Sequence, residues 1–198
     1  MGIAMKLVLC EGKDEVSVME GLCEASGLSG LTVEPIHGKD KLREVLTELP
    51  KRPEFARKEV ESLGILLDAG QDPTAMWQKL RHDVQATLGP ALTDQAVFAG
   101  ERPKVAGLLV GGKDGRGMLE DLCLEAVRSQ PGFPCLEDYF RCLAEKTGQE
   151  EYHSKARFRA WMASQSEFEF HVGKAAEKGF LPWANPAFDR LREFLKKL

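Results

Sequence analysis

Short apolar runs recur through the first half of the chain and predict a series of strands. Residues 6–10 and 63–67 are almost continuously apolar, which is typical of strands covered on both faces, as in a parallel sheet. The predicted strands cover residues 6–10, 31–36, 60–68, 95–99 and 105–110. Pro35 weakens the second of these and favours an edge position.

Segments with helical periodicity follow the first three strands. We expect Asp14 to cap the first helix, and Asp72 to cap the third, which begins at Pro73. A charged stretch, residues 51–58, is expected to form a solvated loop. Alternation of strands and helices predicts an α/β fold with a mainly parallel sheet flanked by helices.

After about residue 110 no strand pattern returns. A glycine-rich stretch at residues 111–117 is expected to be flexible, and apolar stripes at helical spacing fill the remainder. We therefore predict an α/β domain over residues 1–112 and a helical extension packed on it over residues 113–198. One of these helices is basic at residues 155–159, which indicates either a contact surface or a solvated face.

Composition narrows the range of functions. The 198 residues carry a net charge of −4, so any contact with nucleic acid needs local basic patches, a bound metal or a partner. Neither a membrane-length apolar run nor a signal peptide is recognisable, so we expect a cytoplasmic protein without membrane contacts. Five cysteines form no CxxC pair and are expected to be reduced core residues: Cys10, Cys23, Cys123, Cys135 and Cys142.

Two acids stand where predicted strands end. Glu11 follows the first strand, and Asp68 closes a buried one. Ligand chemistry in parallel sheets gathers at the carboxyl ends of strands, so we expect these two carboxylates to share a divalent cation, with help from Asp72. A solvated loop acid at Glu11 and a simple helix cap at Asp72 remain the alternatives.

Other candidate ligands lie near the predicted strand ends. Gly-Lys-Asp occurs after three strands, at residues 12–14, 38–40 and 112–114. These repeats would bring Gly12, Lys13, Lys39 and Lys113 to one sheet edge, where they could bind phosphate. Alternatively, the repeat is only strand-to-helix punctuation. Glu120 could supply a further metal-binding acid, or could merely stabilise the dipole of the helix that it begins.

The order of these motifs resembles the Toprim domain. Glu11 with the Gly-Lys-Asp-Glu that follows it, and then Asp68 and Asp72, carries the resemblance over about residues 5–112. Most of the chain is similar to short stand-alone Toprim-like proteins of unknown function related to OLD-type nucleases. The resemblance implies Glu11 as general acid/base and Asp68 as a ligand of Mg²⁺ or Mn²⁺, with Asp72 at the third acidic position. Gly70 occupies the position of the second family aspartate, so metal affinity is expected to fall.

Two functions follow as hypotheses. One is a Mg-dependent nuclease, a hydrolase that acts on DNA or RNA. The other is a degenerate Toprim-like module that binds nucleic acid or a partner protein, such as a separate ATPase, without catalysis. A flavodoxin-like regulator with Asp68 as phosphate acceptor is a lesser alternative, because the accompanying Thr/Lys pair is not evident.

Overall fold

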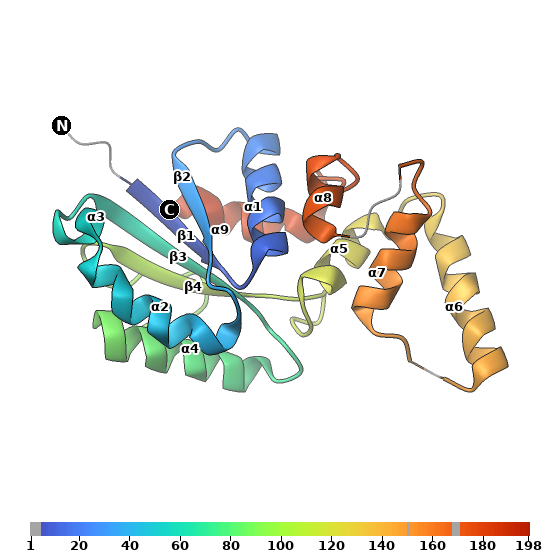
Figure 1. The fold of residues 1–198 in the computed structure, drawn as a ribbon, viewed down its shortest axis with the longest axis horizontal. Coiled ribbons are helices and arrows are strands. Elements are labelled where there is room, and N and C mark those ends of the chain that lie inside the picture. The colour runs from blue at the N-terminus through green and yellow to red at the C-terminus, as the bar shows by residue number, and fades with distance from the viewer. Residues whose placement is uncertain (1–4, 150, 168–170) are drawn as a thin grey trace.

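A four-stranded parallel sheet forms the centre of the protein. The computed structural model describes residues 5–149, 151–167 and 171–198. The strands, in the spatial order β2-β1-β3-β4, are β1 (Met5–Cys10), β2 (Leu31–Pro35), β3 (Val60–Asp68) and β4 (Lys104–Val110). The predicted α/β architecture with its parallel sheet is confirmed, and β2 lies at an edge as Pro35 indicates (Figure 1).

Helices flank the sheet and continue beyond it. They are α1 (Lys13–Ala25), α2 (Leu42–Glu48), α3 (Pro53–Ala56), α4 (Pro73–Leu88), α5 (Leu119–Val127), α6 (Phe133–Thr147), α7 (Ser154–Ala163), α8 (Val172–Glu177) and α9 (Asp189–Lys197). Short 3₁₀ turns are η1 (Lys39–Lys41), η2 (Leu49–Lys51) and η3 (Pro186–Phe188). In Figure 1, α2 and α4 lie on one side of the sheet and α1 and α9 on the other, while α6 and α7 extend away from it.

Two cores explain the apolar run at residues 7–10 of β1. Leu7 and Leu9 belong to the core beneath α2 and α4, whereas Val8 and Cys10 belong to the core on the opposite face. Successive side chains of a strand point to opposite faces, so a central strand covered on both sides is apolar at successive positions where it is buried.

The C-terminal helix packs directly on the sheet. A Cβ atom at Gly64 would lie 3.0 Å from Phe194 Cε1, so the absent side chain lets α9 approach β3. Ser62 Oγ donates a hydrogen bond to the Leu198 carbonyl oxygen at 2.8 Å. The predicted helical C-terminal extension is present, and residues on both sides of position 112 share one core. The domain boundary at that position stays a prediction.

The predicted strand at residues 95–99 is wrong. Ala96 has a left-handed φ of 60°, which interrupts an extended chain, and only Ala99 forms an isolated antiparallel bridge, with Val105. Gln95 instead uses its side-chain Oε1 to accept a hydrogen bond from the Leu109 N–H at 2.9 Å. The segment therefore covers the outer edge of β4 without becoming a strand.

Two smaller predictions also need correction. Residues 51–58 are not simply a loop, because they contain the single turn α3, with Pro53 at its first position. Asp14 does not cap α1, whose N-cap residue is Gly12. The Oδ1 atom of Asp14 accepts a hydrogen bond from the Gly173 N–H at 3.1 Å and thereby links α1 to α8.

The predicted cap of α4 by Asp72 is confirmed, since Asp72 Oδ1 accepts a hydrogen bond from the Ala75 N–H at 2.9 Å.

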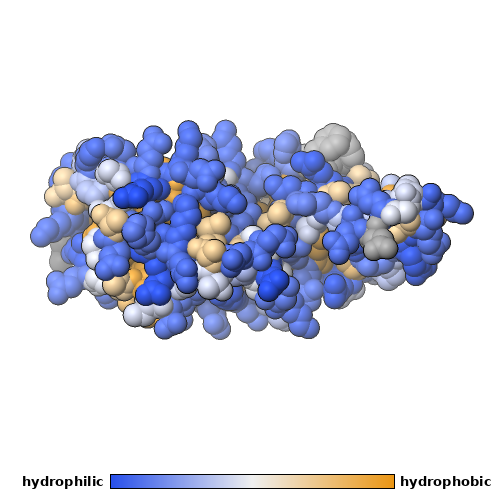
Figure 2. All heavy atoms as spheres, turned by 90° about the horizontal axis from the view of Figure 1, so that it is seen from below, coloured by the Kyte–Doolittle hydropathy of each residue, from blue (hydrophilic) through white to orange (hydrophobic). Residues whose placement is uncertain are grey.

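The face of the molecule that Figure 2 shows is mostly hydrophilic. Seen from below the view of Figure 1, hydrophobic side chains occur as small separate groups (Figure 2). None of the described helices combines the length and apolar character that a membrane crossing needs. All five cysteines are free, but Cys135 and Cys142 on α6 are exposed, so the expectation of core positions holds only for the other three.

Candidate functional site

Strand pairing brings Glu11 to the end of β3. β1 and β3 run parallel with Cys10 opposite Leu66, so the residue after β1 lies beside the last residues of β3. Glu11 Oε2 accepts a hydrogen bond from the backbone N–H of Asp68, with a distance of 3.3 Å. The structure thus places both acids at the carboxyl edge of the sheet, where ligand sites of parallel sheets usually lie.

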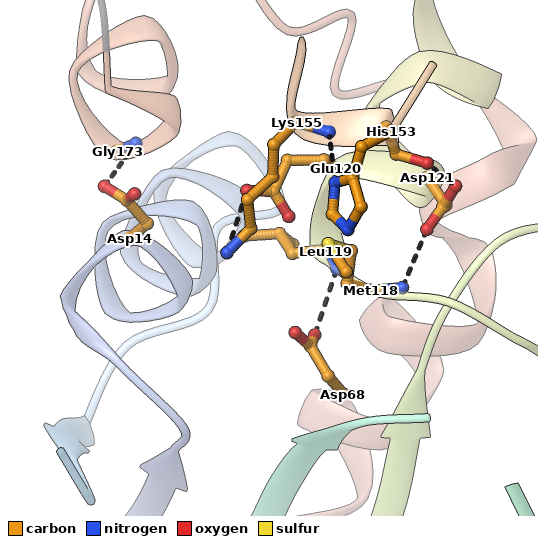
Figure 3. Close-up of polar contacts among 10 residues, drawn as sticks. Asp14, Asp68, Met118, Leu119, Glu120, Asp121, His153, Lys155 and Gly173 are labelled. Carbon is orange, nitrogen blue, oxygen red and sulfur yellow. Dashed lines mark hydrogen bonds and ion pairs between the residues drawn. The ribbon is translucent and has the colours of Figure 1, made fainter. Parts of the chain in front are cut away.

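The Asp68 carboxylate points toward the start of α5. Its Oδ1 accepts a hydrogen bond from the Leu119 N–H at 3.0 Å (Figure 3). Leu119 is the first residue of α5, where free N–H groups and the helix dipole favour negative charge. Within the described residues, Asp68 forms no ion pair with lysine or arginine, so no cationic side chain stabilises the ionised form of its carboxyl group.

Burial and neighbouring acids disfavour the charged form of Asp68. They raise its pKa from 3.8 to about 8, with burial the largest cause, followed by the charges of Glu15 and Glu11. The Leu119 hydrogen bond acts in the opposite direction, and Glu120 adds to the increase. We call Glu11, Glu15, Asp68 and Glu120 the carboxylate cluster.

The other members of this cluster show the same crowding of negative charge. Burial is the largest cause of the raised pKa of Glu15, and the charges of Glu11 and Glu120 add to it. Burial also raises the pKa of Glu120, which lies in the first turn of α5. The cluster is therefore an acidic site with more negative charge than its surroundings neutralise.

One lysine from α7 reaches the cluster. Lys155 Nζ lies 3.8 Å from Glu120 Oε1, and its charge lowers the pKa of Glu120 against the effect of burial (Figure 3). Arg157, on the same helix, is also engaged, in an ion pair with Glu137 on α6. The basic stretch at residues 155–159 thus has partners within the protein at two of its cations.

A backbone latch positions α5 over Asp68. Gly70 N donates to the Gly117 carbonyl oxygen at 2.6 Å, and Gly117 N donates to the Gly70 carbonyl oxygen at 2.8 Å. Gly70 has φ +64°, a conformation that suits glycine. The Met118 N–H donates to Asp121 Oδ2 at 2.8 Å and so begins the helix. These contacts fold the glycine-rich stretch into a defined loop, and its expected flexibility stays a prediction.

Not all predicted site residues join the cluster. Asp72 is exposed and caps α4. Lys13, Lys39 and Lys113 follow the ends of β1, β2 and β4, and their side chains are exposed. Among the described residues, none of these three lysines forms an ion pair. Gly12 ends the turn into α1 as its N-cap residue.

Sequence reasoning missed Glu15 and Lys155. Glu15 lies four positions after Glu11, in the first turn of α1, so its spacing could have indicated it. Nothing local could have indicated Lys155, because it is 35 positions from Glu120 and meets it only through the packing of α7 on α5.

Among the described residues, no three Asp, Glu, His or Cys side chains converge closely enough to hold a metal ion.

Comparison with known proteins places the chain in a family. No curated protein and no solved structure gives a significant match. A family model described as "Protein of unknown function (DUF3226)" matches residues 5–198. Because this match covers nearly all of the 198 residues, the chain belongs to the DUF3226 family.

Proposed function

We propose that this protein is an enzyme that cleaves phosphodiester bonds of DNA or RNA with the help of Mg²⁺ or Mn²⁺, in the manner of OLD/Toprim-type nucleases. The observation that carries the proposal is the contact between Glu11 Oε2 and the Asp68 backbone at the carboxyl edge of two parallel strands. Two further acids, Glu15 and Glu120, lie near enough for their charges to raise the pKa of Asp68.

The donor set suits a hard cation. Carboxylate oxygens are the ligands that Mg²⁺ takes, and Mg²⁺ sites often use only one or two protein carboxylates together with waters and substrate phosphates. Glu11 and Asp68 would hold the ion, and Glu120 would join if it left Lys155. Such an ion would polarise a phosphate and make a bound water more acidic. This coordination does not require the three converging side chains that the described residues lack.

The chain's own groups have separate tasks in this proposal. Glu11 is the general acid/base, and it moves the proton between its carboxylate and the attacking water or leaving oxygen. Lys13 and Lys113, exposed near the carboxyl ends of β1 and β4, attract the phosphate backbone, which the net charge of −4 would otherwise repel. Asp72 keeps its role as a helix cap.

A second candidate function has its own support. Position 70, where the Toprim pattern has an aspartate, is a glycine that the protein uses to latch residue 117. Lys155 already neutralises part of the charge on Glu120. Both features favour a module that binds nucleic acid or a partner protein, such as an ATPase, without cleaving a bond.

A nuclease assay decides between these candidates. Supercoiled plasmid and a single-stranded oligonucleotide are incubated with the wild type, Glu11→Gln and the exposed-acid control Glu44→Gln, in Mg²⁺ and in Mn²⁺. We expect cleavage by the wild type and the control, and a loss of about 100-fold or more in Glu11→Gln. If all three proteins cleave equally, or none cleaves, the enzyme proposal fails, and binding of the same oligonucleotide in a gel-shift assay then supports the second candidate.

A further inference from the structure

A cavity of about 580 Å³ opens beside the carboxyl end of β4. It lies between the last residues of β4, the loop 111–115, α5 and the segment from η3 into α9. Its volume falls in the range of small-molecule sites. None of its lining residues belongs to the carboxylate cluster, so the cavity is a separate feature of the molecule.

The lining combines an apolar wall with positive charge. Leu109, Leu122 and Leu191 are buried side chains of the wall, and they come from β4, α5 and α9. The cations are Lys113, Arg128 and Arg190, all with exposed side chains. Glu125 is the one carboxylate in the lining, and its Oε2 lies 3.5 Å from Nε of Arg128. Positive charge is therefore in excess here, although the chain as a whole is negative.

Arg190 is held in place without an acidic partner. Its Nη2 donates to Gln95 Oε1 at 2.6 Å, and the same oxygen accepts from the Leu109 N–H at 2.9 Å. Partial burial lowers the pKa of Arg190 below its ordinary value. Within the part of the chain that the structure describes, neither Arg190 nor Lys113 forms an ion pair. A fixed guanidinium beside an apolar wall suits an anion, because each charge-assisted hydrogen bond to it is strong.

The position of the cavity favours phosphate. Open α/β sheets bind ligands outside the carboxyl ends of their strands, and β4 ends at Val110 in the cavity wall. Arginine offers a planar fork of donors and lysine a mobile point charge, a pair that suits the several oxygens of a phosphate group. The leucine wall leaves room for an apolar body on the same ligand.

We propose that this cavity binds a small organic phosphate, whose apolar body lies against the leucine wall and whose phosphate contacts Arg190 and Lys113. Nucleotides and alkyl phosphates share this chemistry. The proposal goes beyond the nuclease proposal and does not depend on it, because the carboxylate cluster and the cavity have no residue in common. Lys113 is the one residue that both proposals use, and Arg190 belongs to the cavity alone.

Calorimetric titration tests the proposal with AMP, adenosine, octyl phosphate and octanoate as probes. We expect saturable binding of AMP or octyl phosphate to the wild type, and binding at least about tenfold weaker for adenosine and octanoate. AMP binding more tightly than octyl phosphate identifies a nucleotide site, and the reverse order an alkyl phosphate site. Arg190→Gln should weaken binding about tenfold, because it removes one charge-assisted interaction.

Three further variants make the result specific. Arg141→Gln replaces an exposed arginine of α6 that pairs with Asp138 and lies outside the cavity lining, and this variant should bind as the wild type does. Ser129→Trp, at an exposed lining position, should block binding while all charges remain. Asp68→Asn should bind normally, which separates this site from the carboxylate cluster. The proposal is overturned if neither phosphate binds the wild type, if octanoate binds as tightly as octyl phosphate, or if Arg190→Gln and Ser129→Trp both bind like the wild type.

Discussion

The Leu119 N–H donates a hydrogen bond to Asp68 Oδ1 at 3.0 Å and so ties the end of β3 to the first turn of α5. Asp68 therefore has a structural role whatever its chemistry. Substitution by alanine would remove the acceptor and confuse the two roles. Asparagine keeps an acceptor oxygen while it removes the charge, so Asp68→Asn is the informative variant.

Asp68 is expected to make stability depend on pH. The folded protein raises its pKa from 3.8 to about 8, so between these values the folded state holds a proton that the unfolded state has lost. The free energy of unfolding should therefore fall as pH rises from about 4 to 8, and level off above that. Asp68→Asn should flatten this decline and be more stable than the wild type at pH 8, by about 1 kcal/mol or more.

Urea unfolding at a series of pH values, without divalent cations, measures this effect. The exposed acid variant Glu44→Gln is the control and should keep the wild-type pH profile. An Asp68→Asn profile parallel to that of the wild type would show that the Asp68 carboxyl group is not perturbed.

Substitution of glycine by alanine in the loop 111–117 should destabilise the protein more at Gly117 than at Gly115. Gly115 and Gly117 lie in the same loop with φ of +75° and +89°. A Cβ at Gly115 meets nothing within 4 Å, whereas at Gly117 it would clash with the Asp121 carboxylate. We expect Gly115→Ala to cost about 1 kcal/mol through backbone strain, and Gly117→Ala about 2 kcal/mol more through the added clash. Equal costs in urea unfolding would contradict the loop geometry.

The docking of α8 on α1 depends on the small size of Gly173. A Cβ there would lie 2.9 Å from Ser17 Oγ and 3.1 Å from Asp14 Oδ1. Gly173→Ala should lower the free energy of unfolding by about 1–3 kcal/mol. Gly132→Ala is the control, since a Cβ there meets nothing within 4 Å and only the N-cap preference for glycine is lost. Thermal unfolding that ranks the two variants in the opposite order would rule out the close contact.

Lys155 should compete with a cation for Glu120. Its Nζ lies 3.8 Å from Glu120 Oε1, so its removal leaves the cluster more negative. We expect Lys155→Gln to bind Mn²⁺ several-fold more tightly than the wild type in a calorimetric titration. Arg159→Gln removes an exposed cation from the same helix and should change the affinity little. Weaker binding in Lys155→Gln would mean that the lysine supports the site instead.

Local sequence patterns predicted the sheet because strand identity depends on short-range signals. The runs at β1 and β3 are apolar on both faces, and this pattern also implied parallel pairing, which in turn placed Glu11 beside Asp68. The prediction failed at residues 95–99, where side-chain contacts from Gln95 replace a strand ladder. The apolar pattern of residues 95–99 reflects packing against the core beneath α9, where Phe98 stacks on Phe194.

The rest of the site could not be predicted because its partners are distant in sequence. Asp14 was expected to cap its own helix, yet its partner is Gly173, 159 positions away. Lys155 and the Gly70–Gly117 latch likewise arise only when separate segments pack together. A lone polar residue at a helix start fits several roles, and only the tertiary contacts select one of them.

The most direct test of the central claim is a calorimetric titration of Mn²⁺ into the wild type, Asp68→Asn and Asp72→Asn at pH 8. If Glu11 and Asp68 hold a divalent cation together, the wild type and Asp72→Asn will bind Mn²⁺ with similar affinity, and Asp68→Asn will lose at least about tenfold. Equal binding by wild type and Asp68→Asn, or no binding by the wild type, would contradict the claim.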